Sequence, residues 1–339
     1  MKNVRLGKTE ITVNKNGFGA LPIQRISKED AVRLLHKAYD GGIDFYDTAR
    51  MYTDSEEKLG EAFSDRRNHI HISSKTGAVT AEGFWKDLET TLHNLKTDYL
   101  DIYQFHNPAF CPKPGDESGI YDAMLEAKKK GMVLHIGITN HRLNVAQEAI
   151  DSDLYETLQF PFCYLSGEPE LKLLEGCRKK DMGFLSMKAL SGGLITNAAA
   201  AYAFQAQYET LPLWGIQRET ELDQFLSFVQ NPPVMDEELT AVIEKDRSEL
   251  LGEFCRGCGY CMPCPAGIEI NNCARMSLLL RRAPSASYLT PEWQEKMKRI
   301  EDCMHCNSCK KKCPYGLNTP SLLQKNYEDY REILAGKRF

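Results

Sequence analysis

Short apolar runs alternate with amphipathic segments from about residue 16 to residue 230. In residues 27–39, for example, Ala31, Leu34, Leu35 and Ala38 recur at helical spacing, and Ser27 followed by Asp30 resembles a capping box. The runs of strand length are residues 17–21, 43–48, 69–75, 100–106, 134–139, 157–162, 183–187 and 213–216. The segments with helical spacing are residues 27–39, 55–63, 81–95, 120–130, 145–150, 169–180 and 221–229.

This alternation predicts an α/β protein whose strands are parallel. Eight strands interleaved with helices are the number that closes a (β/α)8 barrel. An open, doubly wound sheet is the alternative, because periodicity alone does not reveal closure. We expect residues 4–6 and 12–13 to form a small hairpin that plugs one end of the barrel.

The chain is long enough for a barrel and a second, smaller domain. It has 339 residues, of which 42% are hydrophobic and 26% charged, as expected of a globular protein. Asn231, Pro232 and Pro233 break the last helical pattern. We therefore expect a barrel over residues 1–235, a charged connector over 236–251, and a mostly helical domain over 252–339 that ends in a helix at 322–334.

Charge and hydropathy argue against two classes of partner. The formal net charge is −5 and the pI is about 6.0, which favours neither a nucleic acid nor an anionic membrane. The first ten residues are polar, and no later stretch has the roughly 18 apolar residues of a spanning helix. We expect a cytoplasmic protein.

Cysteine usage points to metal binding in a reducing compartment. Eight of the twelve cysteines fall in two tight runs: Cys255, Cys258, Cys261 and Cys264, and Cys303, Cys306, Cys309 and Cys313. Each run ends in Cys-Pro, and the second has the spacing of bacterial ferredoxins, in which the fourth cysteine binds the other cluster.

This spacing predicts two 4Fe-4S clusters. One is expected on Cys255, Cys258, Cys261 and Cys313, and the other on Cys303, Cys306, Cys309 and Cys264. The first run departs from the ferredoxin spacing, since only Met262 and Pro263 precede Cys264. Structural zinc is the alternative, because paired Cys-x-x-Cys motifs also suit tetrahedral coordination.

Polar residues stand at the ends of the second, third and fourth predicted strands, where barrels carry their chemistry. A carbonyl that accepts hydride needs a proton donor, and a phenol can serve if its pKa is lowered. We expect Tyr52 to be the donor and Lys75 the cation that lowers its pKa. Asp47 would hold Lys75, and His106 would orient the carbonyl oxygen.

The segments around these residues resemble known ones. Residues 42–52 (GIDFYDTARMY), 72–76 (ISSKT) and 99–106 (YLDIYQFH) are similar to those that hold the Asp, Tyr, Lys and His tetrad of aldo-keto reductases. The resemblance covers residue 6 to about residue 229 and implies a nicotinamide-dependent oxidoreductase. Singly, each residue could be an ordinary strand-end or loop side chain, but four in this order favour the tetrad.

The same resemblance implies where the cofactor binds. Thr139, Asn140 and Gln159 match positions that hold the nicotinamide carboxamide. Met187 stands where the family usually has an aromatic residue, and Met187-Lys188 resembles the subgroup that carries ferredoxin-like tails. The segment from Gly215, with Gln217, Arg218 and the following Gln224, resembles the phosphate-binding turn. Arg218 suits a 2′-phosphate, which favours NADP(H) while leaving NAD(H) open, and Phe225 replaces an asparagine that contacts adenine in many members.

Three functions fit these features. The first is NAD(P)H-dependent reduction of a carbonyl, with clusters that are structural or redox-sensing. The second is electron transfer with a ferredoxin or another one-electron carrier as partner. The third is a nicotinamide-sensing regulatory module. The intact tetrad favours the first, with a small carbonyl or alcohol substrate. A hydride carries two electrons and a cubane accepts one, and no flavin motif is present to split the pair.

Overall fold

The computed structural model describes residues 3–250, 254–282 and 285–337. The chain forms two compact units, Met1–Ala189 with Ala198–Asp236, and Leu190–Asn197 with Glu237–Phe339. The expected boundary between connector and cysteine domain, at residues 251–252, lies outside the described residues. Each unit is considered by itself below.

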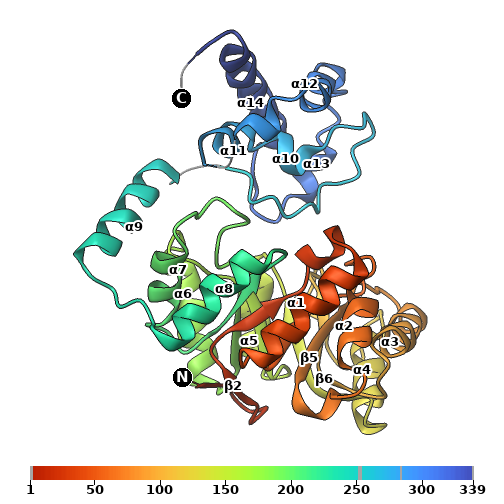
Figure 1. Cartoon of the computed structure of the whole chain (residues 1–339). Helices are drawn as coiled ribbons and strands as arrows, with labels where there is room; N and C mark the ends of the chain where they lie inside the picture. The colour runs from red at the N-terminus through yellow and green to blue at the C-terminus, as the bar shows by residue number, and fades with distance from the viewer. Residues whose placement is uncertain (1–2, 251–253, 283–284, 338–339) are drawn as a thin grey trace. The chain divides into compact units, whose positions relative to one another are not determined.

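The first unit is a closed parallel barrel of eight strands in the order β10-β3-β4-β5-β6-β7-β8-β9 (Figure 1). Closure confirms the (β/α)8 prediction over the open sheet. The strands are β3 (Gly17–Gly19), β4 (Phe45–Asp47), β5 (His71–Thr76), β6 (Leu100–His106), β7 (Val133–Thr139), β8 (Thr157–Pro161), β9 (Gly183–Met187) and β10 (Leu211–Gly215).

Helices follow the strands and cover the barrel. In α1, the Ser27 side chain accepts the Asp30 N–H as the sequence predicted. Sequence periodicity missed α7, whose alanine-rich sequence has no polar face to mark it. The helices are α1 (Lys28–Asp40), α2 (Ser55–Phe63), α3 (Ala81–Leu95), α4 (Ile120–Lys129), α5 (Leu143–Ser152), α6 (Glu168–Lys179), α7 (Ala198–Gln205) and α8 (Glu219–Gln230), with short 3-10 turns at Pro22–Arg25 and Arg67–His69.

A hairpin closes the end of the barrel where the strands begin. Its strands, β1 (Asn3–Arg5) and β2 (Thr12–Asn14), pair antiparallel. Val4, Leu6, Ile11 and Val13 pack in one buried cluster with side chains near the starts of the barrel strands, including Phe45 and Leu211. This apolar seal leaves the opposite end, where the strands finish, as the place for a site.

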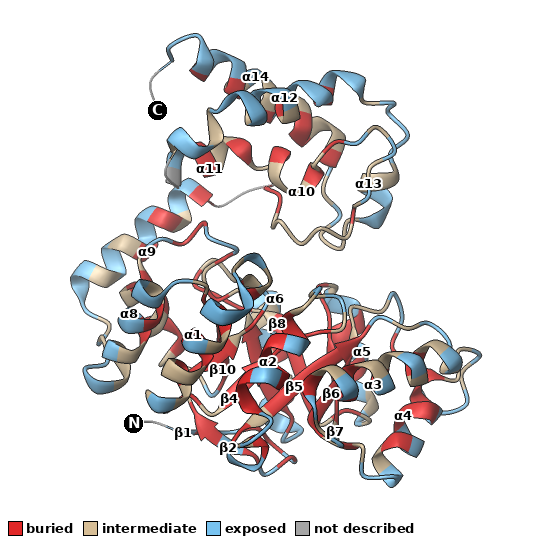
Figure 2. Cartoon of the chain, turned by 45° about the vertical axis from the view of Figure 1, so that its right-hand side comes forward, coloured by how far each residue is buried: buried red, intermediate tan, exposed pale blue. Residues whose placement is uncertain are grey.

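Strand register brings the predicted side chains together at that opposite end. Asp47 lies opposite Ser73 of β5, and Lys75 lies opposite Gln104 of β6. His106 lies opposite Thr139, which in turn lies opposite Gln159. The strands are mostly buried (Figure 2), so polar groups placed there are shielded from water.

The second unit is helical in its described part. The segment predicted as a charged connector contains a helix, α9 (Glu237–Leu250), and the predicted spacer helix is divided into α10 (Ile270–Cys273) and α11 (Met276–Arg282). The remaining elements are 3-10 turns at Ser285–Tyr288 and Arg299–Asp302 and the helices α12 (Pro291–Lys298), α13 (Ser308–Lys312) and α14 (Thr319–Leu334). No helix in the described residues of either unit has both the length and the apolar content needed to cross a bilayer.

Candidate functional site

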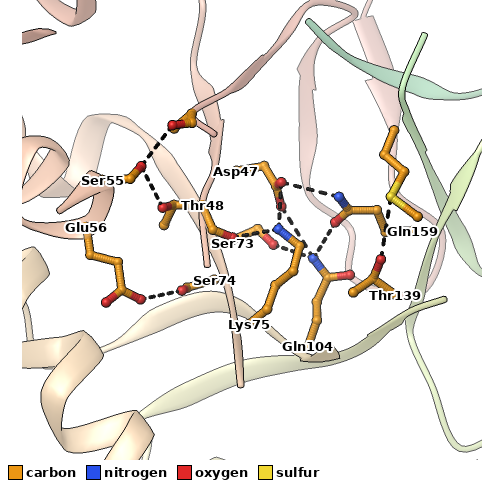
Figure 3. Close-up of polar contacts among 12 residues, drawn as sticks. Asp47, Thr48, Ser55, Glu56, Ser73, Ser74, Lys75, Gln104, Thr139 and Gln159 are labelled. Atoms are coloured by element: carbon orange, nitrogen blue, oxygen red, sulfur yellow. Dashed lines mark hydrogen bonds and ion pairs between the residues drawn. The ribbon is translucent and has the colours of Figure 1, made fainter. Parts of the chain in front are cut away.

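A buried ion pair lies where β4 and β5 end. Lys75 Nζ donates to Asp47 Oδ2 at 2.7 Å and to the Thr48 carbonyl at 2.6 Å (Figure 3). The same Nζ lies 5.2 Å from the centre of the Tyr52 ring. The His106 ring meets the Tyr52 ring edge-on, with 5.9 Å between ring centres. The structure therefore brings together all four residues that the sequence singled out.

Burial governs the charges at this site. It lowers the pKa of the Lys75 ammonium and raises that of the Asp47 carboxyl, and the attraction between the two opposes both shifts. Burial, with the Lys75 charge adding to it, lowers the pKa of His106 to about 3. The His106 imidazole is consequently neutral at physiological pH.

Two glutamines extend the hydrogen bonding from Asp47. Gln104 Nε2 donates to Gln159 Oε1 and to Ser73 Oγ, each at 2.7 Å (Figure 3). Gln159 Nε2 donates to Asp47 Oδ2 at 3.3 Å. No role for Gln104 was predicted from the sequence. Its place two residues before His106 on the same strand, which makes both side chains point inward, was the signal that could have revealed it. It links the carboxylate of the ion pair to the glutamine predicted to hold the cofactor.

A second buried carboxylate lies behind Lys75. Glu56, which is 1% exposed, accepts hydrogen bonds from Ser74 Oγ at 2.7 Å and Thr91 Oγ1 at 2.8 Å. Its other oxygen pairs with Arg50, whose backbone N–H donates to the Lys75 carbonyl at 3.0 Å. This network fixes the backbone on both sides of Lys75. The sequence did not reveal it, because Glu56 reads as an ordinary first-turn acid of α2.

The predicted nicotinamide contacts lie within β8 and at or directly after the ends of β7 and β9. Thr139 Oγ1 lies 3.8 Å from Met187 Sδ, and Lys188 follows with a left-handed φ of 56°. Asn140 already holds its loop, since its Oδ1 accepts the N–H groups of the next two residues and its Nδ2 donates to Pro108 O at 2.9 Å. One amide donor each remains on Asn140 and Gln159 for a carboxamide.

The predicted phosphate-binding turn is capped by its own helix. The N–H groups of Gln217 and Arg218 donate to Glu221 Oε2 at 3.0 and 3.1 Å. The Arg218 guanidinium also pairs with Glu221, at 2.7 Å. Glu221 thus occupies the donors that a phosphate would use.

The rest of this turn divides into exposed and buried parts. Gly215 and Gln224 are exposed, within reach of a ligand. Phe225 is buried and stacks on Trp214, with 4.4 Å between ring centres. An adenine contact from Phe225 is therefore closed off by the core packing.

Two thiols of the second unit, one from each expected cluster set, have close neighbours from both cysteine runs. Burial raises the pKa of the Cys255 thiol, with Cys258 and Cys313 close enough to add to the shift. Burial likewise raises the pKa of Cys309, with added effects from Cys303 and Cys264. Each of these thiols thus has a neighbour from the opposite run, Cys313 for Cys255 of the first expected set and Cys264 for Cys309 of the second.

A cavity marks the second set. It is lined by Cys261, Cys264, Cys303, Cys306 and Cys309. Among the described residues no group of three or more His, Cys, Asp or Glu side chains is arranged to hold a single metal ion. The thiol-rich lining of this cavity provides the donor type that an iron-sulfur cluster requires.

Comparison with known families identifies both units. The profile of the Aldo/keto reductase family matches residues 15–200. The profile of the 4Fe-4S dicluster domain matches residues 254–318, which contain all eight cysteines of the two runs. This second match supports iron-sulfur chemistry over the zinc alternative.

Curated relatives and solved structures agree with the first match. An uncharacterized oxidoreductase, YqkF, of Bacillus subtilis is 27% identical over 58% of this chain and 67% of its own. L-galactose dehydrogenase of Arabidopsis thaliana is 29% identical over 56% of this chain and 66% of its own. Methylglyoxal reductase DkgB of Salmonella typhi is 30% identical over 41% of this chain and 52% of its own.

Solved structures bear on the fold alone. The aldo-keto reductase AKR11C1 of Bacillus halodurans covers 73% of this chain and 96% of its own at a TM-score of 0.64 and 19% identity. An aldo-keto reductase structure from Pseudomonas covers 68% of this chain and 94% of its own at a TM-score of 0.61 and 22% identity. Both support the barrel.

Proposed function

Because the chain belongs to the aldo/keto reductase family, we propose that this oxidoreductase reduces an aldehyde or ketone to an alcohol with NADPH. One observation carries the proposal. The Lys75 ammonium is buried against Asp47 and faces the ring of Tyr52, whose other neighbour is a neutral His106. Relatives named as a reductase and as a dehydrogenase support a small carbonyl or alcohol as substrate.

The four side chains divide the work as follows. Tyr52 gives its phenolic proton to the substrate oxygen, and the Lys75 ammonium stabilises the phenolate that remains. Asp47 keeps Lys75 protonated in a buried place where an unpaired ammonium would lose its proton. Neutral His106 orients the carbonyl oxygen by a hydrogen bond without adding a second positive charge.

NADPH, when bound, supplies the hydride. Gln159 is held by Gln104 and Asp47, and it retains an amide donor for the carboxamide. Asn140 retains one as well, and Thr139, Met187 and Lys188 would line the same wall. Gly215, Gln217, Arg218 and Gln224 would meet the adenosine half once Glu221 releases the turn. NADH remains the alternative cofactor, because Arg218 is already paired with Glu221.

We further propose that the second unit holds its two 4Fe-4S clusters on crossed cysteine sets. One cluster would bind Cys255, Cys258, Cys261 and Cys313, and the other Cys303, Cys306, Cys309 and Cys264. The thiol neighbours of Cys255 and Cys309 support this exchange between the runs. Eight cluster thiolates also favour a reducing compartment such as the cytoplasm.

The test of the proposed function is removal of one hydroxyl. Tyr52→Phe should lower kcat for carbonyl reduction by about 10²–10⁴-fold while NADPH binding, followed by nicotinamide fluorescence, is retained. Tyr46→Phe is the matched control. Tyr46 lies six residues earlier, is buried, and gives its hydroxyl to the Ile43 carbonyl at 2.9 Å, so its loss should leave kcat near that of the native protein. Full activity in Tyr52→Phe would refute the assignment.

A second function is favoured by the dicluster domain itself. In this alternative, one-electron chemistry at the clusters is the main activity and the barrel site is auxiliary. Reduction of the clusters by NADPH, read as bleaching of their visible absorption under anaerobic conditions, would support it. Unchanged absorption during turnover with a carbonyl substrate would support hydride transfer as the principal reaction.

A further inference from the structure

Three consecutive lysines lie between two cysteines that we assign to different clusters. Lys310, Lys311 and Lys312 belong to α13 and follow Cys309 directly. We propose that these lysines, with Met304 and Cys306, form a docking surface for a small acidic one-electron carrier protein. This group of five residues is called the lysine face below. The proposal rests on the cluster assignment made above.

The charge of the lysine face is not neutralised locally. All three lysines are exposed. No ion pair involving any of them occurs among the described residues, although Lys296 and Lys337 of the same unit are paired. Residues 303–313 contain no Asp or Glu. On a chain with a formal net charge of −5, this is a local concentration of unpaired positive charge.

The second cysteine set comes to the surface at this place. Cys306 is exposed, whereas Cys255 and Cys261 of the first set are buried. Met304 is 64% exposed and lines the same cavity as Cys306. Electron transfer between proteins requires a short path, so the exposed cysteine makes the second cluster the one that can exchange electrons with a partner.

The features of the lysine face fit one kind of partner. Redox encounters use small, transient interfaces, and complementary charge gives them speed and orientation more than tight binding. Exposed, unpaired lysines close in sequence to the exposed Met304 and Cys306 would attract an acidic carrier and repel a basic one. In the encounter the carrier loses one electron and the dicluster domain gains it, with no bond formed or broken.

The experiment measures association rather than turnover. The anaerobically purified full-length protein with its clusters is titrated with a strongly acidic bacterial ferredoxin, and association is followed by surface plasmon resonance at increasing salt. The association rate should fall steeply with salt, because the Debye length shortens from about 30 Å at 0.01 M to about 10 Å at 0.1 M. Basic cytochrome c, which the net charge of −5 would attract to other surfaces, should not associate more slowly when the three lysines are substituted.

Charge reversal then locates the surface. The variant Lys310→Glu, Lys311→Glu, Lys312→Glu should associate with the ferredoxin about tenfold or more slowly than the native protein. The control is Lys86→Glu, Lys129→Glu, Lys180→Glu, which changes net charge equally at exposed lysines of the barrel unit and should associate at nearly the native rate. Equal losses in both variants, or none in the first, would overturn the proposal.

Two further measurements keep the result interpretable. Iron and sulfide analysis of each variant shows whether both clusters are present, and a variant lacking one is replaced by Lys310→Gln, Lys311→Gln, Lys312→Gln, for which a slower association is again expected. Native protein with both clusters that binds ferredoxin without salt dependence would refute the lysine face while leaving the cluster assignment intact. Tyr52→Phe should bind ferredoxin normally, so failure of the carbonyl reductase proposal is recognised separately.

Discussion

Replacing Asp47 by Asn tests the buried ion pair on which the proposed chemistry depends. The substitution keeps the shape of the side chain but removes the charge that lies 2.7 Å from Lys75 Nζ. Lys75 would keep the Thr48 carbonyl as an acceptor, yet its ammonium would be buried without a counter-charge. Removing one partner of a buried pair costs about 3–5 kcal/mol, so the free energy of unfolding should fall by that amount.

The double variant Asp47→Asn, Lys75→Met separates stability from activity. It removes the uncompensated charge as well, and should therefore recover about 1–4 kcal/mol of the lost stability. Carbonyl reduction should be impaired in both variants, because Lys75 lacks the carboxylate that keeps it protonated in the single variant and is absent from the double variant. Urea unfolding and steady-state kinetics on the same preparations provide both quantities.

The pH dependence of the single variant has a definite sign. Burial lowers the pKa of Lys75 in the folded protein, and without Asp47 nothing of comparable strength opposes this. The unfolded chain would then bind more protons than the folded one up to the ordinary lysine pKa of about 10.4, so stability rises with pH. The difference in free energy of unfolding between the native protein and Asp47→Asn should therefore become smaller between pH 7 and pH 10. A single variant as stable as the native protein, or a double variant no more stable than the single one, would show that the Asp47 charge does not stabilise the buried Lys75 ammonium.

Three further changes follow from particular contacts. Glu221→Gln should tighten NADPH binding by roughly tenfold, about 1.4 kcal/mol, because it removes a carboxylate from the predicted phosphate turn; nicotinamide fluorescence titration would measure this, and weaker binding would contradict it. Phe225→Asn, which installs the residue that many family members have, should cost roughly 3–5 kcal/mol of stability through loss of the stack on Trp214, and a smaller loss in urea unfolding would argue against that packing. Burial opposes ionisation of Glu156, but hydrogen bonds, led by that with His135, lower its pKa to about 2. The ionised Glu156 side chain therefore stabilises the folded protein fully above about pH 4.3, and this stabilisation is lost as the pH falls through about 2. Stability curves measured between pH 5 and pH 2 should therefore be steeper for the native protein than for Glu156→Gln, and identical slopes would disprove the effect.

The barrel could be predicted because strand and helix periods differ and because their alternation is long. The exact match of residues 100–106 and 183–187 to β6 and β9 reflects sharp boundaries between buried runs and polar turns. The helix α7 was not predicted, because its run of alanines has no amphipathic stripe. The helix α9 was not predicted, because its high charge is equally typical of a linker.

The site could be predicted only where a residue type carries chemistry by itself. Asp47, Tyr52, Lys75 and His106 were recognised by position at strand ends, and the structure brings them together. The hydrogen bonds by which Gln104 supports the site could not be predicted from spacing, because they join strands that are far apart in the sequence.

The phosphate turn shows the same limit. The Glu221 carboxylate accepts hydrogen bonds from the N–H groups that were predicted to bind an anion. This contact depends on the rotamer of Glu221, which the spacing of residues does not determine. Such contacts depend on where the side chains lie in the folded protein, so they cannot be predicted from local sequence patterns.

The most direct test of carbonyl reduction in the barrel is to follow the label from NADPH deuterated at the transferring position of its nicotinamide. Turnover with an aldehyde substrate would be run without any one-electron carrier, and the alcohol analysed by mass spectrometry and NMR. We expect deuterium on the carbinol carbon of the product, with Tyr52→Phe forming little product of any kind. Alcohol that forms at the native rate but carries hydrogen from solvent at that carbon would contradict direct hydride transfer. The electrons and the proton would then have reached the carbon in separate steps.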